Sequence, residues 1–223
     1  PLTRKDAAHY EFTMPDGKVT VKPAFADSST SCPGGIICPT HEMIDVPLDA
    51  WYHDVVDTAV DCGWMNGTGN SQFTPQGTTT RGMLATVLYR MAGSPKAPKS
   101  TFADVESSMY YADAVAWAAE NGIVTGLDAT TYAPAHSITR EQLAAMLYRM
   151  AQHNGQASAG SADVLNGFAD RNAVHDWAKD AMCWAIENGI VTGKGNAVLD
   201  PTGTATRAEV AAMLTRFHNL VGK

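Results

Sequence analysis

Long hydrophobic runs are absent from this sequence, and so are runs of lysine and arginine. No apolar stretch approaches the roughly 18 residues that a membrane-spanning helix needs, so no membrane insertion is expected. Acidic residues outnumber basic ones by 23 to 16, for a net charge of −7, which argues against nucleic acid or an anionic membrane surface as the main partner. Only 17% of the 223 residues are charged, below the roughly 25% of an average soluble chain, which argues against disorder.

Cysteine is also scarce, and four cysteines are too few for a disulfide scaffold of this size. Cys32 and Cys38 enclose a Pro-Gly-Gly loop and are close enough for a small bridge, which the sequence leaves open. No second Cys pair or His pair has zinc-like spacing, so no metal site is expected. Cys62 and Cys183 stand alone in helical-looking runs, which is typical of small buried hydrophobes. The chain begins at Pro1 without a signal peptide, which favours a piece of a longer protein.

Catalytic and cofactor-binding motifs are missing as well. The sequence contains no Gly-x-Ser-x-Gly, no His-Glu-x-x-His, no Walker loop and no dinucleotide fingerprint. His53, His136 and His175 fall at non-equivalent positions of the repeats described next, and we expect them to be solvated. The sequence therefore predicts neither an enzyme nor a cofactor.

The sequence instead contains one segment written three times. The middle copy holds Glu120-Asn-Gly-Ile-Val-Thr-Gly126 and the last copy Glu187-Asn-Gly-Ile-Val-Thr-Gly193, an offset of 67. The first copy is less similar to the other two. It matches the middle copy at an offset of 59, without a gap from Asp45 to Arg81. The predicted organisation is an N-terminal part (1–43) followed by repeats at 44–93, 101–152 and 167–221.

Each copy predicts a helix, a long loop and a second helix, so the expected fold class is mainly α. Apolar residues recur at i, i+3, i+4 and i+7 in both helices, and the first helix ends at an Asn-Gly signal. Three second helices, each apolar on one stripe, are best buried against one another. Trp117 and Trp184 are expected in the core. The apolar or aromatic residue two positions before the loop proline is expected to be an anchor: Phe73, Tyr132 and Leu199.

The N-terminal part has a different pattern. Residues 11–21 alternate apolar and polar on both sides of Asp16-Gly17, which predicts a β-hairpin. An isolated hairpin is marginal in water, so it is expected to end an upstream β domain or to pack on the helical body.

A Thr-Arg pair begins the second helix of every copy. The threonine suits an N-cap, and Gln142 and Glu209 complete capping boxes, whereas Met83 in the first copy does not. A cation in the first turn faces the positive end of the helix dipole, which costs a few tenths of a kcal/mol. Each arginine is therefore expected to pair with a carboxylate. That carboxylate is either internal or belongs to an external ligand, which free N–H groups and a guanidinium would bind. The arginines are Arg81, Arg140 and Arg207, and the internal candidates Asp45, Asp104 and Asp170.

Aromatic residues and glycines recur too. An aromatic residue follows the aspartate of each copy by six or seven positions, at Trp51, Tyr110 and Trp177. These residues either pack as staples or form platforms for sugar rings. The glycines Gly67, Gly126 and Gly193 serve either turn geometry or close approach of a ligand.

These motifs, with Phe-x-Asp-Val and Ile-Thr-Arg-Glu-Gln-Leu-Ala, resemble S-layer homology domains from about Ile44 to Val221. The resemblance implies a pseudo-threefold body around a central helix bundle, with grooves between the units. It also implies an extracellular place on a bacterial cell surface, and a secondary cell-wall polysaccharide with pyruvate ketals as the ligand. The carboxylate of the ketal would meet the motif arginine. An acidic protein can bind it, because charges more than about 8 Å away are largely screened.

Some positions depart from the family pattern: Gly82 and Met83 after Arg81, Cys62 in place of Asn, Ala178 in place of an aromatic residue, and Arg171-Asn172 after Asp170. They leave open which grooves bind, with the middle copy as first choice. The alternative function is adhesion to a protein, either a host receptor or another surface-layer subunit. Its specificity would lie in the unrepeated Cys32–Cys38 loop and the hairpin.

Overall fold

The computed structural model describes residues 2–4, 10–12 and 38–222. This part of the chain is mainly α-helical, as the repeat pattern predicts. The α-helices are α1 (His53–Asp61), α2 (Arg81–Met91), α3 (Ala112–Glu120), α4 (Arg140–His153), α5 (Lys179–Glu187) and α6 (Arg207–Val221). Short 3-10 helices lie between α4 and α5: η2 (Ala162–Gly167), η3 (Arg171–Ala173) and η4 (Asp176–Ala178). None of the helices in the described ranges is long and apolar enough to cross a membrane.

Two short strands lie near the N-terminus. β1 (Leu2–Arg4) and β2 (Tyr10–Phe12) pair antiparallel, with Leu2 opposite Phe12. The predicted hairpin turn at Asp16-Gly17 lies outside the described residues and stays a prediction. What the structure shows is β2 paired with the strand before it.

The second helices begin where the Thr-Arg pairs predict. Thr139 and Thr206 each accept a hydrogen bond from the N–H of the third helical residue, and that residue's side chain bonds back to the threonine N–H. Thr80 accepts from the Met83 N–H, but Met83 cannot return a hydrogen bond. Both predicted capping boxes are confirmed, as is the missing half in the first copy.

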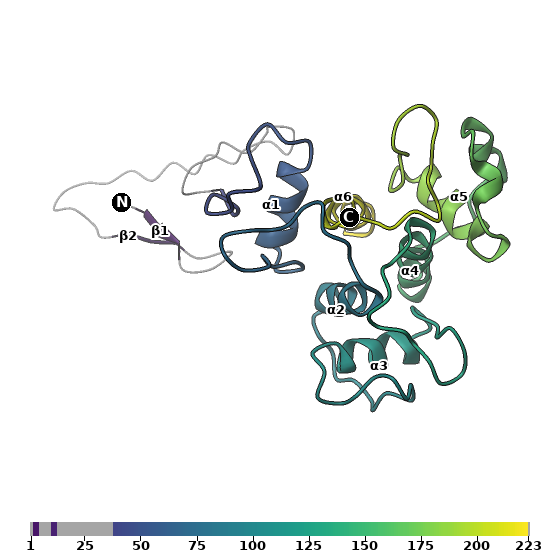
Figure 1. The fold of residues 1–223 in the computed structure, drawn as a ribbon, viewed down its shortest axis with the longest axis horizontal. Coiled ribbons are helices and arrows are strands. Elements are labelled where there is room, and N and C mark those ends of the chain that lie inside the picture. The colour runs from purple at the N-terminus through teal and green to yellow at the C-terminus, as the bar shows by residue number, and fades with distance from the viewer. Residues whose placement is uncertain (1, 5–9, 13–37, 223) are drawn as a thin grey trace.

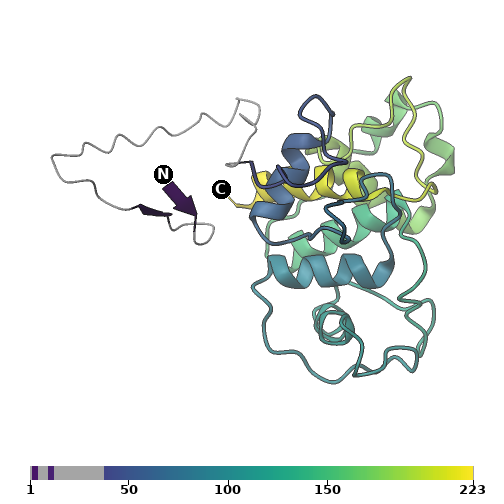
Figure 2. The same ribbon diagram turned by 60° about the vertical axis from the view of Figure 1, so that its left-hand side comes forward.

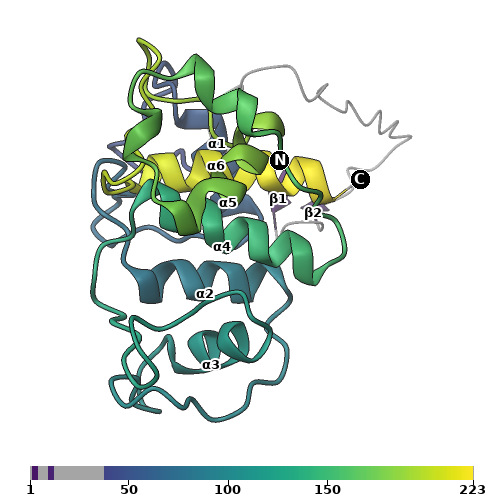
Figure 3. The ribbon, with the colours of Figure 1, turned by 90° about the vertical axis from the view of Figure 1, so that its right-hand side faces the viewer.

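The second helices α2, α4 and α6 lie side by side at the centre, and α1, α3 and α5 lie outside them (Figures 1 and 3). Each outer helix packs on a helix of another copy: α3 on α2, α5 on α4, and α1 on α6. Figure 2 shows α1, from the start of the first copy, against α6 at the end of the last. The chain therefore closes on itself.

Backbone hydrogen bonds join the three long loops in a ring. The Thr79 N–H donates to the Ala205 carbonyl at 3.3 Å, Ala205 to Ile138 at 3.0 Å, and Ile138 to Thr79 at 2.8 Å. These three residues are separated by 59 and 67 positions, the offsets of the repeat. Each lies two residues before the first residue of a second helix, so the ring fixes the starts of α2, α4 and α6 relative to one another.

The aromatic residues predicted for the core are buried. Trp117 and Trp184 are 6% and 1% exposed. Each packs on a tyrosine of the preceding copy, with the rings of Tyr89 and Trp117 5.6 Å apart and those of Tyr148 and Trp184 5.3 Å apart. The loop anchors are also buried: Phe73, Tyr132 and Leu199.

Two expectations about single side chains are wrong, and one open question is narrowed. Cys38 is a free thiol, turned inward so that its Sγ contacts Asp57 on α1, whereas Cys32 lies outside the described residues. His53 is buried rather than solvated. Cys62 is exposed at the end of α1, while Cys183 is buried as expected.

Candidate functional site

The arginines of the Thr-Arg pairs hold the loop of the next copy around the ring. Each Nε donates to the carbonyl of a loop anchor, which lies on another repeat. The pairs are Arg81 with Tyr132 at 2.9 Å, Arg140 with Leu199 at 2.8 Å, and Arg207 with Phe73 at 2.7 Å. The Arg81 and Arg207 guanidiniums also lie over the anchor rings, 4.5 and 4.4 Å from the ring centroids. The arginines are thus part of the fold, whatever else they bind.

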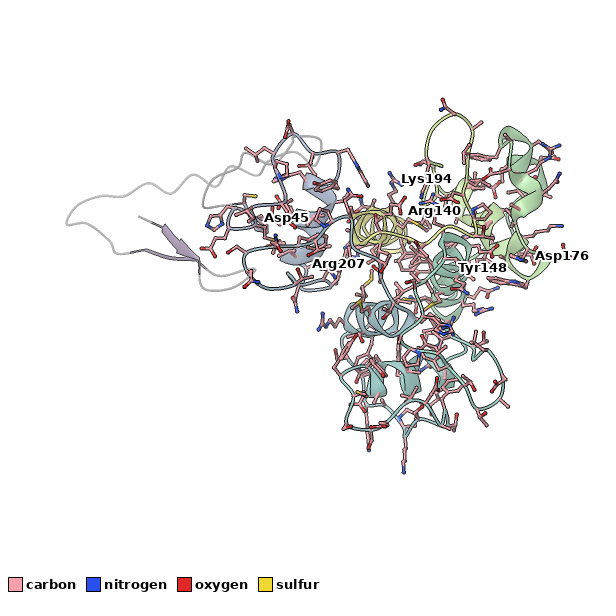
Figure 4. All side chains as sticks on the ribbon, in the orientation of Figure 1. Asp45, Arg140, Tyr148, Asp176, Lys194 and Arg207 are labelled. Carbon is pink, nitrogen blue, oxygen red and sulfur yellow. The ribbon has the colours of Figure 1, made fainter. Side chains whose placement is uncertain are left out.

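The three aspartates hold the same loops from the other side. Each carboxylate accepts the N–H of the anchor and of the residue after it, at 2.7 to 2.9 Å. Within the described ranges no salt bridge joins Asp45, Asp104 or Asp170 to a Thr-Arg arginine. The aspartate and the arginine thus bind the two backbone groups of one anchor residue. Asp45 accepts the Phe73 N–H and Arg207 donates to the Phe73 carbonyl; both side chains lie beside α1 (Figure 4).

The charges still act on one another across the loop. Burial lowers the pKa of Arg207, and Asp45 opposes that effect. Desolvation acts to raise the pKa of Asp170, but the N–H groups of Leu199 and Asp200 and the charge of Arg140 outweigh it, and the pKa is lowered.

The N–H groups at the helix starts are not free, contrary to expectation. In α2 the N–H of Arg81 donates to His136 and that of Gly82 to Pro134, both at 2.9 Å. The first two N–H groups of α4 and α6 bond to the same positions of the next loop, and the third bonds to the capping threonine. A ligand can therefore meet these arginines only through their guanidinium groups.

Two of these arginines line grooves of the same design. The Arg81 groove, of about 410 Å³, is bounded by the loop 124–127, the face of α4 that ends at Arg149, and Trp177 of the last copy. The Arg140 groove, of about 380 Å³, is bounded by the loop 190–194, the face of α6 that ends at Arg216, and Trp51 of the first copy. Each groove thus combines residues of all three copies at equivalent repeat positions.

The aromatic residue at each rim faces solvent. Trp51 is 63% exposed and Trp177 52%, although large aromatic side chains are usually buried. Tyr110, 64% exposed, holds the equivalent position and lies near Thr80 and Arg90. All three stand clear of the core, and the Trp177 ring stacks with the His175 ring, with the ring centroids 6.1 Å apart.

Each groove also contains a second arginine, which the sequence motifs did not single out as a site residue. Arg149 and Arg216 recur with Arg90 at the repeat offsets, and that recurrence is a signal that could have identified them. Burial lowers the pKa of Arg149 and so does the like charge of Arg81; Arg216 and Arg140 form the same kind of pair. Two guanidiniums thus face each groove, an arrangement that attracts an anion.

The two grooves differ in charge. In the Arg140 groove Arg140 Nη1 lies 3.2 Å from Glu209, and Lys194 Nζ lies 3.4 Å from the same carboxylate and 2.8 Å from Asp200; Lys194 and Arg140 are seen together in Figure 4. The Arg81 groove has Gln142 and Leu127 at the positions of Glu209 and Lys194. Arg149 has no hydrogen-bond or salt-bridge partner within residues 38–222. The Arg81 groove therefore carries the less neutralised positive charge.

The recurrent glycines are required by their own loops. A Cβ on Gly126 would meet the Phe102 ring and a loop carbonyl, and one on Gly67 would lie 2.9 Å from the Gln72 carbonyl oxygen. Gly193 has a φ of +80°, which other residues rarely adopt. Gly126 and Gly193 also line the grooves, but turn geometry is sufficient to explain them.

Three segments of the chain match the S-layer homology domain: residues 45–82, 101–144 and 167–211. Together they cover more than half of the chain. The chain belongs to the S-layer homology family. Its three S-layer homology domains contain the Thr-Arg pairs and the aspartates that grip the loops.

Several curated proteins share this region. The chain is 30% identical over 172 residues to the surface-layer 125 kDa protein of Lysinibacillus sphaericus, covering 76% of this chain and 14% of that protein. It is 32% identical over 167 residues to an amylopullulanase of Thermoanaerobacterium thermosulfurigenes, covering 74% and 9%. It is 25% identical over 158 residues to a cellulosome-anchoring protein of Acetivibrio thermocellus, covering 69% and 35%. The chain thus spans less than a fifth of the first two relatives.

Proposed function

We propose that this chain is a non-covalent, non-catalytic cell-wall anchoring module on a bacterial cell surface. Its three S-layer homology domains would form a pseudo-threefold body, and the grooves between them would bind a secondary cell-wall polysaccharide with pyruvate ketals. The names of the surface-layer and cellulosome-anchoring relatives support the anchoring role. The groove geometry supports the choice of ligand.

The observation that carries the proposal is the pair of guanidiniums beside an exposed tryptophan. A ketal-linked pyruvate is a small carboxylate on a rigid sugar, and a forked guanidinium can bind a carboxylate through two hydrogen bonds. Such an anion would relieve the repulsion between Arg81 and Arg149. The Trp177 ring would stack on the sugar, and Ala145 and Met146 would contact the ketal methyl group.

The Arg81 groove is the stronger candidate, because no carboxylate is among its lining residues. In the Arg140 groove Glu209 competes with the ligand for Arg140. We expect the Arg81 groove to bind the polysaccharide more tightly, and binding in both grooves to weaken as the salt concentration rises.

The test uses Arg149 and Trp177, since Arg81 and Arg140 also hold the fold together. Purified bacterial cell-wall sacculi are incubated with wild type, Arg149→Gln, Trp177→Ala and the matched control Arg171→Gln, which removes an exposed arginine outside the grooves. Loss of charge-assisted hydrogen bonds worth about 1.5–3 kcal/mol should weaken binding roughly 10- to 100-fold in Arg149→Gln. Arg171→Gln should bind like wild type, and all four should keep the same melting temperature.

The sacculi themselves separate the parts of the proposal. Stripping the polysaccharide should abolish binding, and removing only the pyruvate ketals with mild acid should weaken wild type to the level of Arg149→Gln. Equal binding to ketal-free sacculi would show that pyruvate is not the ligand. If folded Arg149→Gln binds sacculi as tightly as wild type does, the Arg81 groove is not the binding site. A wild type that ignores untreated sacculi would refute anchoring and leave protein adhesion as the hypothesis to pursue.

A further inference from the structure

A cluster of polar side chains is buried where the chain enters the first repeat. Cys38, Thr40, His53 and Asp57 are 2%, 1%, 3% and 7% exposed. His53 and Asp57 lie four residues apart on one face of α1, and Cys38 and Thr40 come from the segment that covers this face. Burying four polar groups together is costly unless each is satisfied, so the cluster calls for an explanation.

The middle repeat provides an internal comparison. The positions 59 residues after Cys38, His53 and Asp57 hold Ala97, Ala112 and Ala116. Ala112 and Ala116 are buried on the corresponding face of α3. The same helix therefore folds in the middle repeat with small apolar residues, and the fold of the repeat does not require the polar cluster.

The donor atoms have the spacing of a metal site. Cys38 Sγ lies 3.5 Å from His53 Nε2 and 3.3 Å from Asp57 Oδ2, and Nε2 lies 3.3 Å from Oδ2. Bond lengths of about 2.3 Å to sulfur and about 2.1 Å to nitrogen and oxygen place the donors of a tetrahedral zinc ion about 3.4 to 3.6 Å apart. Each edge of the triangle agrees with that spacing to within about 0.3 Å.

Neighbouring groups orient two of the three donors. His53 Nδ1 lies 3.1 Å from the Val46 carbonyl, which can only accept, so Nδ1 carries a proton and Nε2 is the nitrogen that faces Cys38 and Asp57. The Thr40 hydroxyl donates to Asp57 Oδ1 at 2.5 Å, which leaves Oδ2 directed at His53. Partners of this kind accompany metal-binding histidines and carboxylates.

We propose that Cys38, His53 and Asp57 bind a zinc ion. A thiolate, an imidazole and a carboxylate suit zinc, whereas calcium and magnesium prefer oxygen ligands alone. The two negative ligands balance the charge of the ion, so the buried site is neutral. Three protein ligands leave the fourth position for water.

The zinc ion would tie the segment before the first repeat to α1. Sequence spacing could not predict this, because Cys38 stands 15 residues before His53, outside the first repeat. The one local signal is the pair His53 and Asp57, four residues apart on one helix face. The anchoring function is independent of this proposal.

The test measures metal binding by the full chain under reducing conditions. Chelator-treated protein is titrated with Co²⁺, which reports its ligands spectroscopically, and then with Zn²⁺. We expect one equivalent of Co²⁺, a thiolate-to-cobalt charge-transfer band, the visible bands of a tetrahedral ion, and displacement by Zn²⁺. Zn²⁺ should also raise the melting temperature, because a ligand that binds only the folded state stabilises it.

Three variants locate the site. Cys38→Ser should lose the charge-transfer band, whereas the matched control Cys62→Ser, at the far end of α1, should keep it. Thr40→Val keeps all three ligands but loses the orienting hydroxyl, and should weaken Zn²⁺ affinity roughly 10- to 100-fold.

Other outcomes overturn the proposal. A wild type without the charge-transfer band would show that the Cys38 thiolate does not bind the metal, and would leave Cys38 with its hydrogen bond to Asp57 alone. A band that survives in Cys38→Ser and disappears in Cys62→Ser would place the metal elsewhere. Should Cys38→Ser fail to fold by circular dichroism, the spectrum of the wild type, compared with Cys62→Ser, still decides.

Discussion

The loop anchor, which stands two residues before each loop proline, has its backbone N–H and its carbonyl held by charged side chains. In the last repeat Asp170 accepts the N–H of Leu199 and Arg140 donates to its carbonyl. Hydrogen bonds to charged groups contribute about 1.5–3 kcal/mol each, more than neutral ones. An arginine can therefore stand at the unfavourable end of the helix dipole in all three repeats, because its hydrogen bond to the neighbouring loop offsets the electrostatic cost.

Replacing Asp170 by asparagine tests this arrangement. We expect Asp170→Asn to lower the free energy of unfolding at pH 7 by about 1–3 kcal/mol. Because the pKa of Asp170 is lowered on folding, the carboxylate stabilises the protein above its unfolded pKa of about 3.9, and this contribution is lost as the pH falls through the folded pKa. The gap between wild type and Asp170→Asn should therefore narrow below about pH 4.

Denaturant unfolding at pH 7 and at pH 3 measures the gap. Asp163→Asn, which changes an exposed aspartate outside the loops, is the control and should follow wild type at both pH values. A gap that is the same at pH 7 and pH 3 would mean that the carboxylate charge plays no part.

At the scale of single helices, the three second helices differ in how they begin. Those at Thr139 and Thr206 have complete capping boxes, while the one at Thr80 has only half, because Met83 stands where a glutamine or glutamate is needed. Met83 is 37% exposed, so a polar side chain can replace it without entering the core.

The substitution Met83→Gln should complete the box at α2. We expect a gain of about 0.5–1 kcal/mol in the free energy of unfolding, since Thr80 would acquire the back-bond that Gln142 gives Thr139. Thermal unfolding of wild type, Met83→Gln and Met83→Ala measures it. Met83→Ala removes the same methionine without providing an acceptor, so an equal gain in both variants would contradict the capping explanation.

Local features of these helices could be predicted from the sequence, and long-range ones could not. Thr139 and Gln142 are three residues apart, and the burial of Trp117 follows from its place on the apolar face of a helix. The loop carbonyls that occupy the N–H groups of α2 lie more than 50 residues away, so those groups were expected to be free. Burial of His53 depends on Cys38 and Thr40, which no helical period relates to it.

The candidate site shows the same division. The repeat identified Arg81 and Trp177, but only folding brings them to one groove from the first and last repeats. Arg149 recurs as regularly as Arg81. It stands near the C-terminal end of a helix, however, where the helix dipole favours a cation, so its position does not by itself indicate a ligand. Its role depends on its distance from Arg81, which only the fold defines.

At the scale of the whole molecule, the packing units are not the repeats of the sequence. Because α3 packs on α2 and α5 on α4, each repeat depends on its neighbour, and the first helix α1 depends on the last, α6. The Thr215 hydroxyl contacts the Val55 carbonyl at 3.4 Å, and the His218 ring lies 4.8 Å from that of Trp64. These contacts join the first repeat to the last, so that within residues 38–222 the three repeats form a ring.

A chain that ends at Ala205 tests whether this ring is one cooperative body. It lacks α6 and with it Arg207, which holds the Phe73 carbonyl. We expect the amide protons of α1 to lose their protection from hydrogen exchange, although α1 lies about 150 residues from the cut, because its buried face would be open to water. A chain without residues 1–37 keeps α1 and α6 together and should keep that protection. Peptides covering His53–Asp61, followed by mass spectrometry, measure the difference. Repeats that fold independently would leave α1 as protected as in wild type, and the closed ring would then contribute nothing to the stability of the first repeat.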